Sequence, residues 1–99
     1  MKTIIFDHGF SCEINEAVLT DWDLSVLIGK ITELEEDGSA GARVKTAPMA
    51  ERVFLKLLGA KQYEDLKESV RDDSGTVQAE KMVGLLEELF TKAGDEVKN

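Results

Sequence analysis

The chain is poor in the residues that build covalent or metal-based frameworks, with one cysteine, one histidine and one proline in 99 residues. A single cysteine excludes an internal disulfide and fits a reducing compartment. No apolar run approaches the roughly 18 residues of a membrane span, so no membrane contact is expected. The opening stretch MKTIIFDHGF has only three consecutive apolar residues before Asp7. That is too short for a signal-peptide core and predicts a cytoplasmic protein.

Positive charge is also scarce, because 12 basic side chains face 20 acidic ones and give a formal net charge of −8. Such a surface repels phosphate backbones, and no stripe of Lys and Arg counters it, so nucleic-acid binding is not expected. An acidic surface keeps a protein dispersed and favours basic partners. Apolar residues at 42% and charged residues at 32% are typical of a globular chain, here of one-domain length.

Hydrophobic spacing predicts an α+β fold, in which an N-terminal β-hairpin over 1–16 packs on a small bundle of about four α-helices. The turn at Gly9 separates two short apolar runs, and glycine supplies the positive φ that a tight turn needs. A lone hairpin is marginal in water and should lean on the helices. The single domain, 1–99, then contains helices at 20–36, 47–58, 60–71 and 76–93, a mobile loop at 37–46 and a frayed tail at 94–99.

The expected helix ends rest on local signals. Thr20 and Thr76 are placed to cap the first and fourth helices, Pro48 suits the first turn of the second, and Gly59 suits the position just past its end. The residues at spacings of three and four that should face inward are Leu24, Leu27, Ile28, Ile31 and Leu34, then Met49, Val53, Phe54, Leu57 and Leu58, then Tyr63, Leu66 and Val70, and finally Ala79, Val83, Leu86, Leu89 and Phe90.

The acidic segment 72–76, DDSGT, resembles a calcium loop only superficially. With Gly75 at the sixth position of such a loop, the first position is Val70 and the twelfth is Lys81, so both ends lack an oxygen ligand. Its two adjacent aspartates point apart and have no apolar surroundings to raise a pKa, which argues against a catalytic pair. The segment is predicted to be a turn between helices.

His8 and Cys12 are the remaining candidates for chemistry. A hairpin could bring them together as a Cys–His nucleophile, although a turn histidine and a core-facing cysteine explain both residues without catalysis. Two such side chains cannot close a zinc site, and no glycine pattern forms a phosphate cradle. We therefore expect no enzymatic activity, no catalytic residues, no metal and no cofactor.

Some apolar residues exceed what one small core requires. Trp22 is out of phase with its helix stripe, so it either packs on the hairpin or is an exposed anchor for a partner. Val26, Met82 and Leu85 flank the main stripes, and these helices are either core elements touched on two sides or the walls of a groove or oligomer interface. The candidate partner-binding residues are Trp22, Val26, Leu85 and Phe90.

The segment FLKLLGAKQYEDLKESV, followed by a glycine-containing turn and a last amphipathic helix, resembles the tail assembly chaperones of long-tailed, siphovirus-type bacteriophages and prophages of Gram-positive hosts. The shared pattern is Leu-Leu-Gly-x-x-Gln-Tyr-x-x-Leu, formed here by Leu57, Leu58, Gly59, Gln62, Tyr63 and Leu66. The stretch LTDWDLSVLIGKITELEEDG is similar to the helix and acidic loop of that family. The resemblance is one of pattern and order and covers nearly the full length.

The resemblance implies a non-enzymatic role in the host cytoplasm. Such chaperones coat the long, apolar, helix-rich tape measure protein and keep it soluble until tail tube subunits replace them. Coating a rod needs many copies, so self-association is expected. The alternative is a small acidic regulatory adaptor or inhibitor that binds a basic protein, for example as a nucleic-acid mimic. Salt separates the two, because only the mimic's complex should weaken steeply as salt is added.

Overall fold

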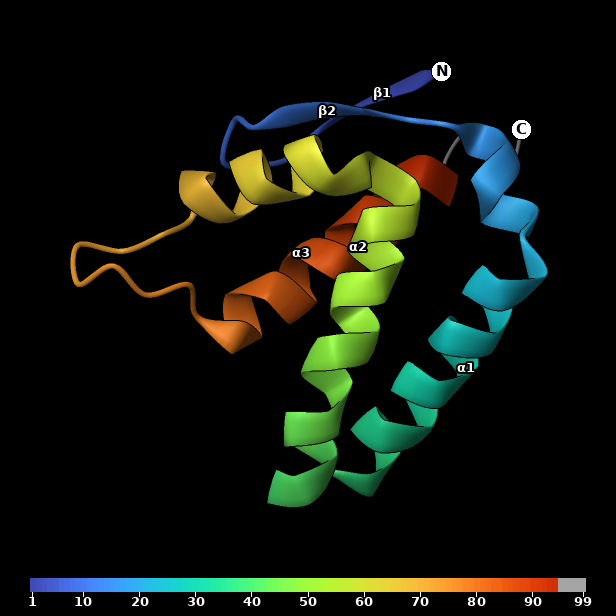
Figure 1. The fold of residues 1–99 in the computed structure, drawn as a ribbon, viewed down its shortest axis with the longest axis vertical. Coiled ribbons are helices and arrows are strands. Elements are labelled where there is room, and N and C mark those ends of the chain that lie inside the picture. Colours follow the sequence, from blue (N-terminus) through green and yellow to red (C-terminus); the bar gives the residue numbers. More distant parts are fainter. Residues whose placement is uncertain (95–99) are drawn as a thin grey trace.

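The computed structural model describes residues 1–94, apart from the side chain of Arg43. Along the chain, the elements are β1 (Lys2–Ile5), β2 (Ser11–Ile14), the 3-10 helix η1 (Glu16–Thr20), α1 (Trp22–Asp37), α2 (Ala40–Ser69) and α3 (Ala79–Gly94) (Figure 1). The predicted α+β class is confirmed, with three α-helices within these residues rather than four. Of the tail expected at 94–99, Gly94 ends α3 and 95–99 lie outside the described residues.

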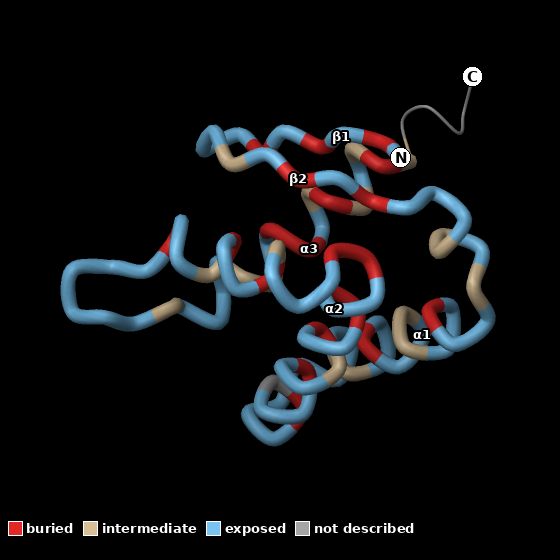
Figure 2. Tube along the Cα trace, turned by 45° about the horizontal axis from the view of Figure 1, so that its top comes forward, coloured by how far each residue is buried: buried red, intermediate tan, exposed pale blue. Residues whose placement is uncertain are grey.

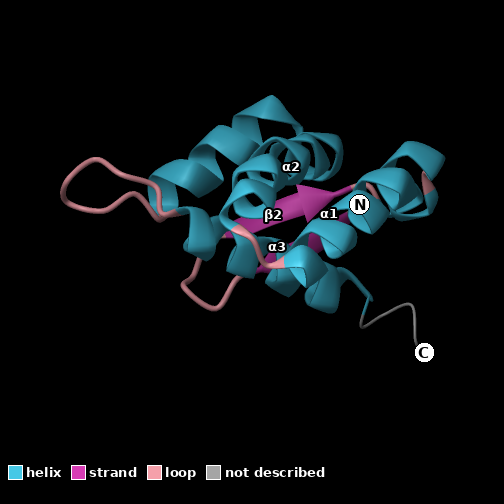
Figure 3. Cartoon of the chain, turned by 90° about the horizontal axis from the view of Figure 1, so that it is seen from below, coloured by secondary structure: helices cyan, strands magenta, loops and turns pink. Residues whose placement is uncertain are grey.

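The hairpin forms as its sequence predicts. β1 and β2 pair antiparallel, with Lys2 opposite Ile14, and Gly9 has a φ of 101° in the turn. The alternating pattern buries one face of the pair, which carries Ile4, Phe6, Cys12 and Ile14. The helices all lie on the side of this face (Figures 1 and 3). A two-stranded hairpin thus gains its stability from the helices beneath it.

Helix α2 is bent at Gly59, which has φ 79° and ψ 166° inside an otherwise helical element. This conformation is open essentially only to glycine. Figure 1 shows the green arm of α2 rising to the bend and the yellow arm turning away from it. The helices expected at 47–58 and 60–71 are therefore two arms of one element. Four helices become three because the helix resumes directly after one residue, without a loop.

The mobile loop expected over 37–46 is wrong, because α2 begins at Ala40. Gly38 ends α1 with φ 69°, and Ser39 caps α2 by accepting the Ala42 N–H at 3.1 Å. The two glycines of this stretch suggested a loop, but Gly41 lies within the first turn of the helix. Pro48 accordingly lies inside α2 and not in its first turn.

The starts of two helices differ from the predicted ones. Asp21, not Thr20, caps α1, because its carboxylate accepts the Leu24 N–H at 3.0 Å and Thr20 ends η1. A carboxylate is the better acceptor for the free N–H groups at a positive helix end. Helix α3 begins at Ala79 and not at residue 76, where the Thr76 N–H instead donates to the Asp72 carboxylate at 3.0 Å.

The core is one cluster between the hairpin and the three helices, and Figure 2 shows its buried segments facing inward. Most predicted stripes contribute to it, but the stripe on α3 is rotated. Its buried residues are Leu85, Leu86, Leu89 and Ala93, whereas Ala79 is exposed. The rotation follows from the hairpin covering the C-terminal half of α3, where Lys2 Nζ donates to the Ala93 carbonyl at 3.1 Å.

None of the helices within residues 1–94 combines the length and the apolar character needed to cross a bilayer.

Candidate functional site

Two adjoining cavities open between the first arm of α2 and the start of α3. The first, about 510 Å³ in volume, is lined by Leu34, Glu35, Gly38, Thr46, Ala79, Glu80, Val83 and Glu87. The second, about 470 Å³, is lined by Thr46, Ala47, Pro48, Ala50, Glu51, Phe54, Tyr63, Lys67, Val77, Ala79, Met82 and Val83. Because they share Thr46, Ala79 and Val83, we treat them as one depression and refer to it as the α2/α3 groove.

The groove is open because the first half of α3 is only partly packed against the core. Ala79, Glu80 and Gly84 are exposed, and the buried part of α3 starts only at Leu85. The bend at Gly59 turns the second arm of α2 away from the first, so residues of both arms line the second cavity. Partly exposed apolar side chains are left along the groove, namely Leu34, Val77, Met82 and Val83.

Aromatic rings form the floor of the second cavity. Phe54 and Tyr63 stack with their ring centres 5.6 Å apart. The Tyr63 hydroxyl donates to the Glu51 carboxylate at 2.8 Å, and burial raises the pKa of this phenol. Lys67 lies 4.7 Å above the Tyr63 ring and pairs with Glu64 at 3.0 Å. The charged groups of this cavity are therefore already engaged.

The first cavity is acidic and lacks such pairing. Glu35 from α1 and Glu80 and Glu87 from α3 line it, and all three are exposed. Within the described part of the chain, none of these carboxylates has a hydrogen-bond or ion-pair partner, and no described basic side chain lines this cavity. The groove thus combines apolar walls with an uncompensated negative rim.

Cys12 lies in the core, and His8 contacts Ser69 at the end of α2. Cys12 is buried, and burial raises the pKa of its thiol to about 11, so the sulfur is protonated at neutral pH. The His8 Nε2 atom lies 2.9 Å from the Ser69 hydroxyl, which in turn donates to the Leu66 carbonyl. Across residues 1–94, no group of three His, Cys, Asp or Glu side chains is arranged to hold a metal ion.

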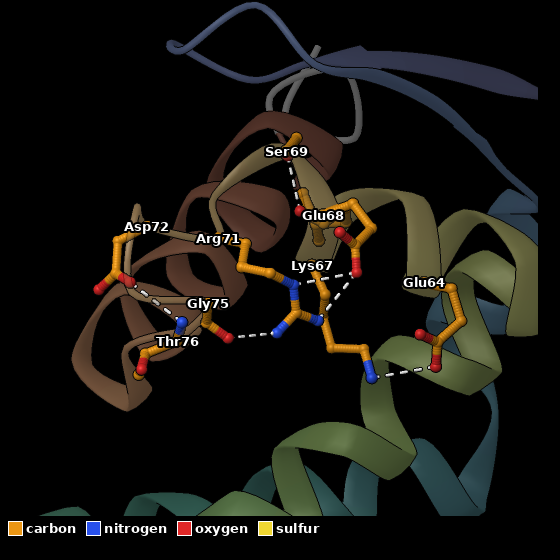
Figure 4. A network of polar contacts seen from close by, with 9 residues as sticks. Glu64, Lys67, Glu68, Ser69, Arg71, Asp72, Gly75 and Thr76 are labelled. Carbon is orange, nitrogen blue, oxygen red and sulfur yellow. Dashed lines mark hydrogen bonds and ion pairs between the residues drawn. The ribbon is translucent and has the colours of Figure 1, made fainter.

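The segment 72–76 is the predicted turn, held by hydrogen bonds to the Asp72 carboxylate, of which the one from Thr76 is drawn in Figure 4. One oxygen of this carboxylate accepts from the Ser74 hydroxyl at 2.6 Å and from the Thr76 N–H at 3.0 Å. These bonds, that of Ser74 above all, lower the pKa of Asp72 to about 2. Arg71 closes the turn by donating to the Gly75 carbonyl at 2.8 Å. The carboxylate of Asp72 thus accepts hydrogen bonds from backbone and hydroxyl groups of the same turn. These bonds give Asp72 a structural role in the acidic segment 72–76.

The four predicted contact residues divide into two pairs. Trp22 is 77% exposed and Val26 is 37% exposed, four residues apart on one face of α1. The interpretation that Trp22 packs on the hairpin is therefore wrong. Leu85 is only 6% exposed and belongs to the core cluster, and Phe90 is half-buried against it. Leu85 is thus a core residue and not a contact residue, because the rotated stripe of α3 turns it inward.

The motif behind the family resemblance shapes the bend of α2. Its large apolar members, Leu57, Leu58, Tyr63 and Leu66, are buried. Gly59 makes the bend, and Gln62 hydrogen-bonds the backbone of β2 at Glu13. Sequence analysis raised a groove on these helices, but of the residues named for it, Val26, Met82 and Leu85, only Met82 lines the α2/α3 groove.

No protein-family model, no curated protein and no solved structure matches this chain. Its function is therefore inferred from the α2/α3 groove and from the resemblance of segment 54–70 to tail assembly chaperones.

Proposed function

We propose that this protein is a phage or prophage tail assembly chaperone, which coats the tape measure protein and keeps it soluble while the tail is assembled in the bacterial cytoplasm. The observation that carries the proposal is the α2/α3 groove. An apolar groove between helices is the usual seat for the apolar face of a partner helix, and a tape measure protein supplies many such helices. The role is one of binding and needs no catalytic residue or cofactor.

The remaining surface suits a coat. With a net charge of −8, the outward faces of bound copies would keep the covered rod dispersed in water. Many copies must lie side by side along the rod, so self-association belongs to the proposal. Trp22 and Val26, together on the exposed face of α1, are the candidate residues for contacts between copies.

Co-expression tests this role directly. A tape measure protein encoded next to this gene should be insoluble alone, soluble with the chaperone, and released when tail tube protein is added. An Ala79→Tyr chaperone should fail to keep it soluble, because this exposed position lines both cavities and a bulky side chain there fills them. A tape measure protein that is equally soluble without the chaperone, or with A79Y, contradicts the proposal.

A second candidate is the acidic adaptor that occupies a basic protein, and the unpaired carboxylates of Glu35, Glu80 and Glu87 favour it. Its complex would depend mainly on charge and would weaken steeply between low and high salt. Tape measure coating depends mainly on apolar burial and should persist. Sedimentation of the complex at low and high salt separates the two candidates.

A further inference from the structure

We propose that the α2/α3 groove accepts an amphipathic α-helix whose apolar face is flanked by lysine or arginine. The inference rests on the proposed function, and it specifies which helices of a tape measure protein such a chaperone would cover. It is carried by two features of the groove, the paired cavities and the unpaired carboxylates.

The paired cavities match the repeat of a helix. Each has a volume of about 500 Å³, which lies within the range of roughly 300–1,000 Å³ of typical binding pockets. They meet at Thr46, Ala79 and Val83, so side chains in the two cavities would come from one continuous ligand. Anchors three, four or seven residues apart lie on the same face of an α-helix. One helix can therefore place successive apolar anchors in both cavities.

The carboxylates of the groove determine which residues the bound helix should carry beside its apolar anchors. Glu35 stands on α1, while Glu80 and Glu87 stand on α3, so two walls of the first cavity carry negative charge. No described side chain neutralises them. Lys67, in the second cavity, already pairs with Glu64. A helix with basic residues beside its anchors supplies the missing countercharge, and an acidic helix meets repulsion.

Charge also disfavours the other occupants. A second copy of this chain carries the same excess of acid, −8, and would bring like charge to the rim. A phosphate-bearing ligand is repelled for the same reason. A neutral apolar compound could contact the apolar walls of the groove, but it would give the carboxylates of Glu35, Glu80 and Glu87 no partner.

Two labelled peptides test the inference on the intact protein. Both are amphipathic helices of about 18 residues, or five turns, with the same leucine anchors. One carries lysines beside the anchors and the other carries glutamates. Fluorescence anisotropy at low salt should show binding of the lysine peptide, with the glutamate peptide at least about tenfold weaker.

Three variants locate the binding. Ala79→Tyr fills the groove from an exposed position and should weaken the lysine peptide at least about tenfold. The triple reversal Glu35→Lys, Glu80→Lys and Glu87→Lys should invert the preference between the peptides. The matched control Glu16→Lys, Glu33→Lys and Asp73→Lys changes net charge equally at exposed positions that line neither cavity, and it should retain the preference. Circular dichroism checks that each variant is folded.

Equal binding of both peptides, or equal weakening by the control triple, overturns the inference. Binding that persists in folded A79Y overturns it as well. If the lysine peptide fails while the tape measure protein is still kept soluble, the inference falls and the proposed function stands. If the peptide binds as expected while no tape measure protein is kept soluble, the inference stands and the proposed function falls.

Discussion

The side-chain amide of Gln62 pairs with the backbone of Glu13 as a neighbouring strand would. Its Oε1 accepts the Glu13 N–H at 2.8 Å, and its Nε2 donates to the Glu13 carbonyl at 2.8 Å. The same Nε2 donates to the Leu58 carbonyl at 2.7 Å, just before the bend at Gly59. One side chain thus joins the outer edge of the hairpin to the bend of α2. This fixes the angle between the arms on which the groove depends.

Replacing Gln62 with leucine should therefore loosen both elements. Three hydrogen bonds are lost, and at about 0.5–1.5 kcal/mol each, reduced here by exposure to water, the free energy of unfolding should fall by about 1–3 kcal/mol. Urea unfolding measures the total, and hydrogen exchange at the Glu13 amide reports the lost contact. Lys61→Leu, at the exposed neighbouring position, serves as the control. Unchanged exchange at Glu13 in Q62L would contradict the pairing.

Gly59 and Gly29 should respond in opposite ways to alanine. A Cβ at either site meets open space, so the difference arises from backbone conformation alone. At Gly59, with φ 79°, alanine is strained, and Gly59→Ala should destabilise the fold by about 1–2 kcal/mol. Gly29 is helical within α1, and Gly29→Ala should stabilise by about 0.5–1 kcal/mol. Thermal and urea unfolding of the pair, compared with wild type, measures both signs.

The sequence predicted what short-range patterns determine. The hairpin face, the stripes of α1 and α2 and the turn at 72–76 follow from alternation, helical spacing and turn chemistry. Gly59 does interrupt the helix as predicted, but it bends α2 and does not end it. A one-residue bend and a helix end have the same local sequence pattern, so the sequence does not distinguish them. The sequence did not predict the start of α2 at Ala40. The two glycines at 38 and 41 indicated a loop, although Ser39 between them is a good helix cap.

The position of the groove could not be predicted because it depends on how elements pack. Leu86 and Leu89 are buried as predicted, whereas Leu85 and Ala93 are buried in place of Ala79 and Val83, which corresponds to a modest rotation of α3 around its axis. That rotation is set by the hairpin, through contacts such as Lys2 to the Ala93 carbonyl, which are distant in sequence. The exposure of Trp22 has the same origin, because η1 and the hairpin leave that face of α1 uncovered.

Substitutions at Leu85 and Val26 should have different effects, one on stability and the other on partner binding. Leu85→Ala empties a core position and should cost about 2–5 kcal/mol in the free energy of unfolding. Val26→Glu changes a side chain that is 37% exposed and should shift stability by no more than about 0.5 kcal/mol. In co-expression, V26E should reduce coating of the tape measure protein while staying folded, because contacts between neighbouring copies are weakened. A folded V26E that coats normally would remove Val26 from the contact surface.

Acid should release the turn at Asp72 within a defined pH range. The pKa of Asp72 is about 2 in the folded chain, below its ordinary value of 3.8. Its contribution to stability is therefore complete above about pH 4 and is lost as the pH falls from there towards 2. Asp72→Asn should be less stable than wild type above this range. The difference in the free energy of unfolding between the two proteins should shrink as the pH falls through it. Asp73→Asn is the control, because no hydrogen bond to the Asp73 carboxylate is formed within the described residues.

Alkylation of Cys12 tests whether Cys12 and His8 could act as a nucleophilic pair. A nucleophilic cysteine needs a thiolate near neutral pH, usually through a histidine that lowers its pKa. Burial instead raises the pKa of Cys12 to about 11 from an ordinary 9.0, so the native protein should hold about a hundredfold less thiolate than the unfolded chain at pH 7. Iodoacetamide should react slowly with the native protein and normally in urea.

The residual native reaction should pass through transient opening of the hairpin, since the thiol is covered. Its rate should then rise in Q62L, where the hairpin is less firmly held, and should be unchanged in His8→Asn. The opposite result would be a fast native reaction that titrates below pH 7 and slows in H8N. Such a result would show that His8 activates Cys12, and it would replace a binding role with a catalytic one.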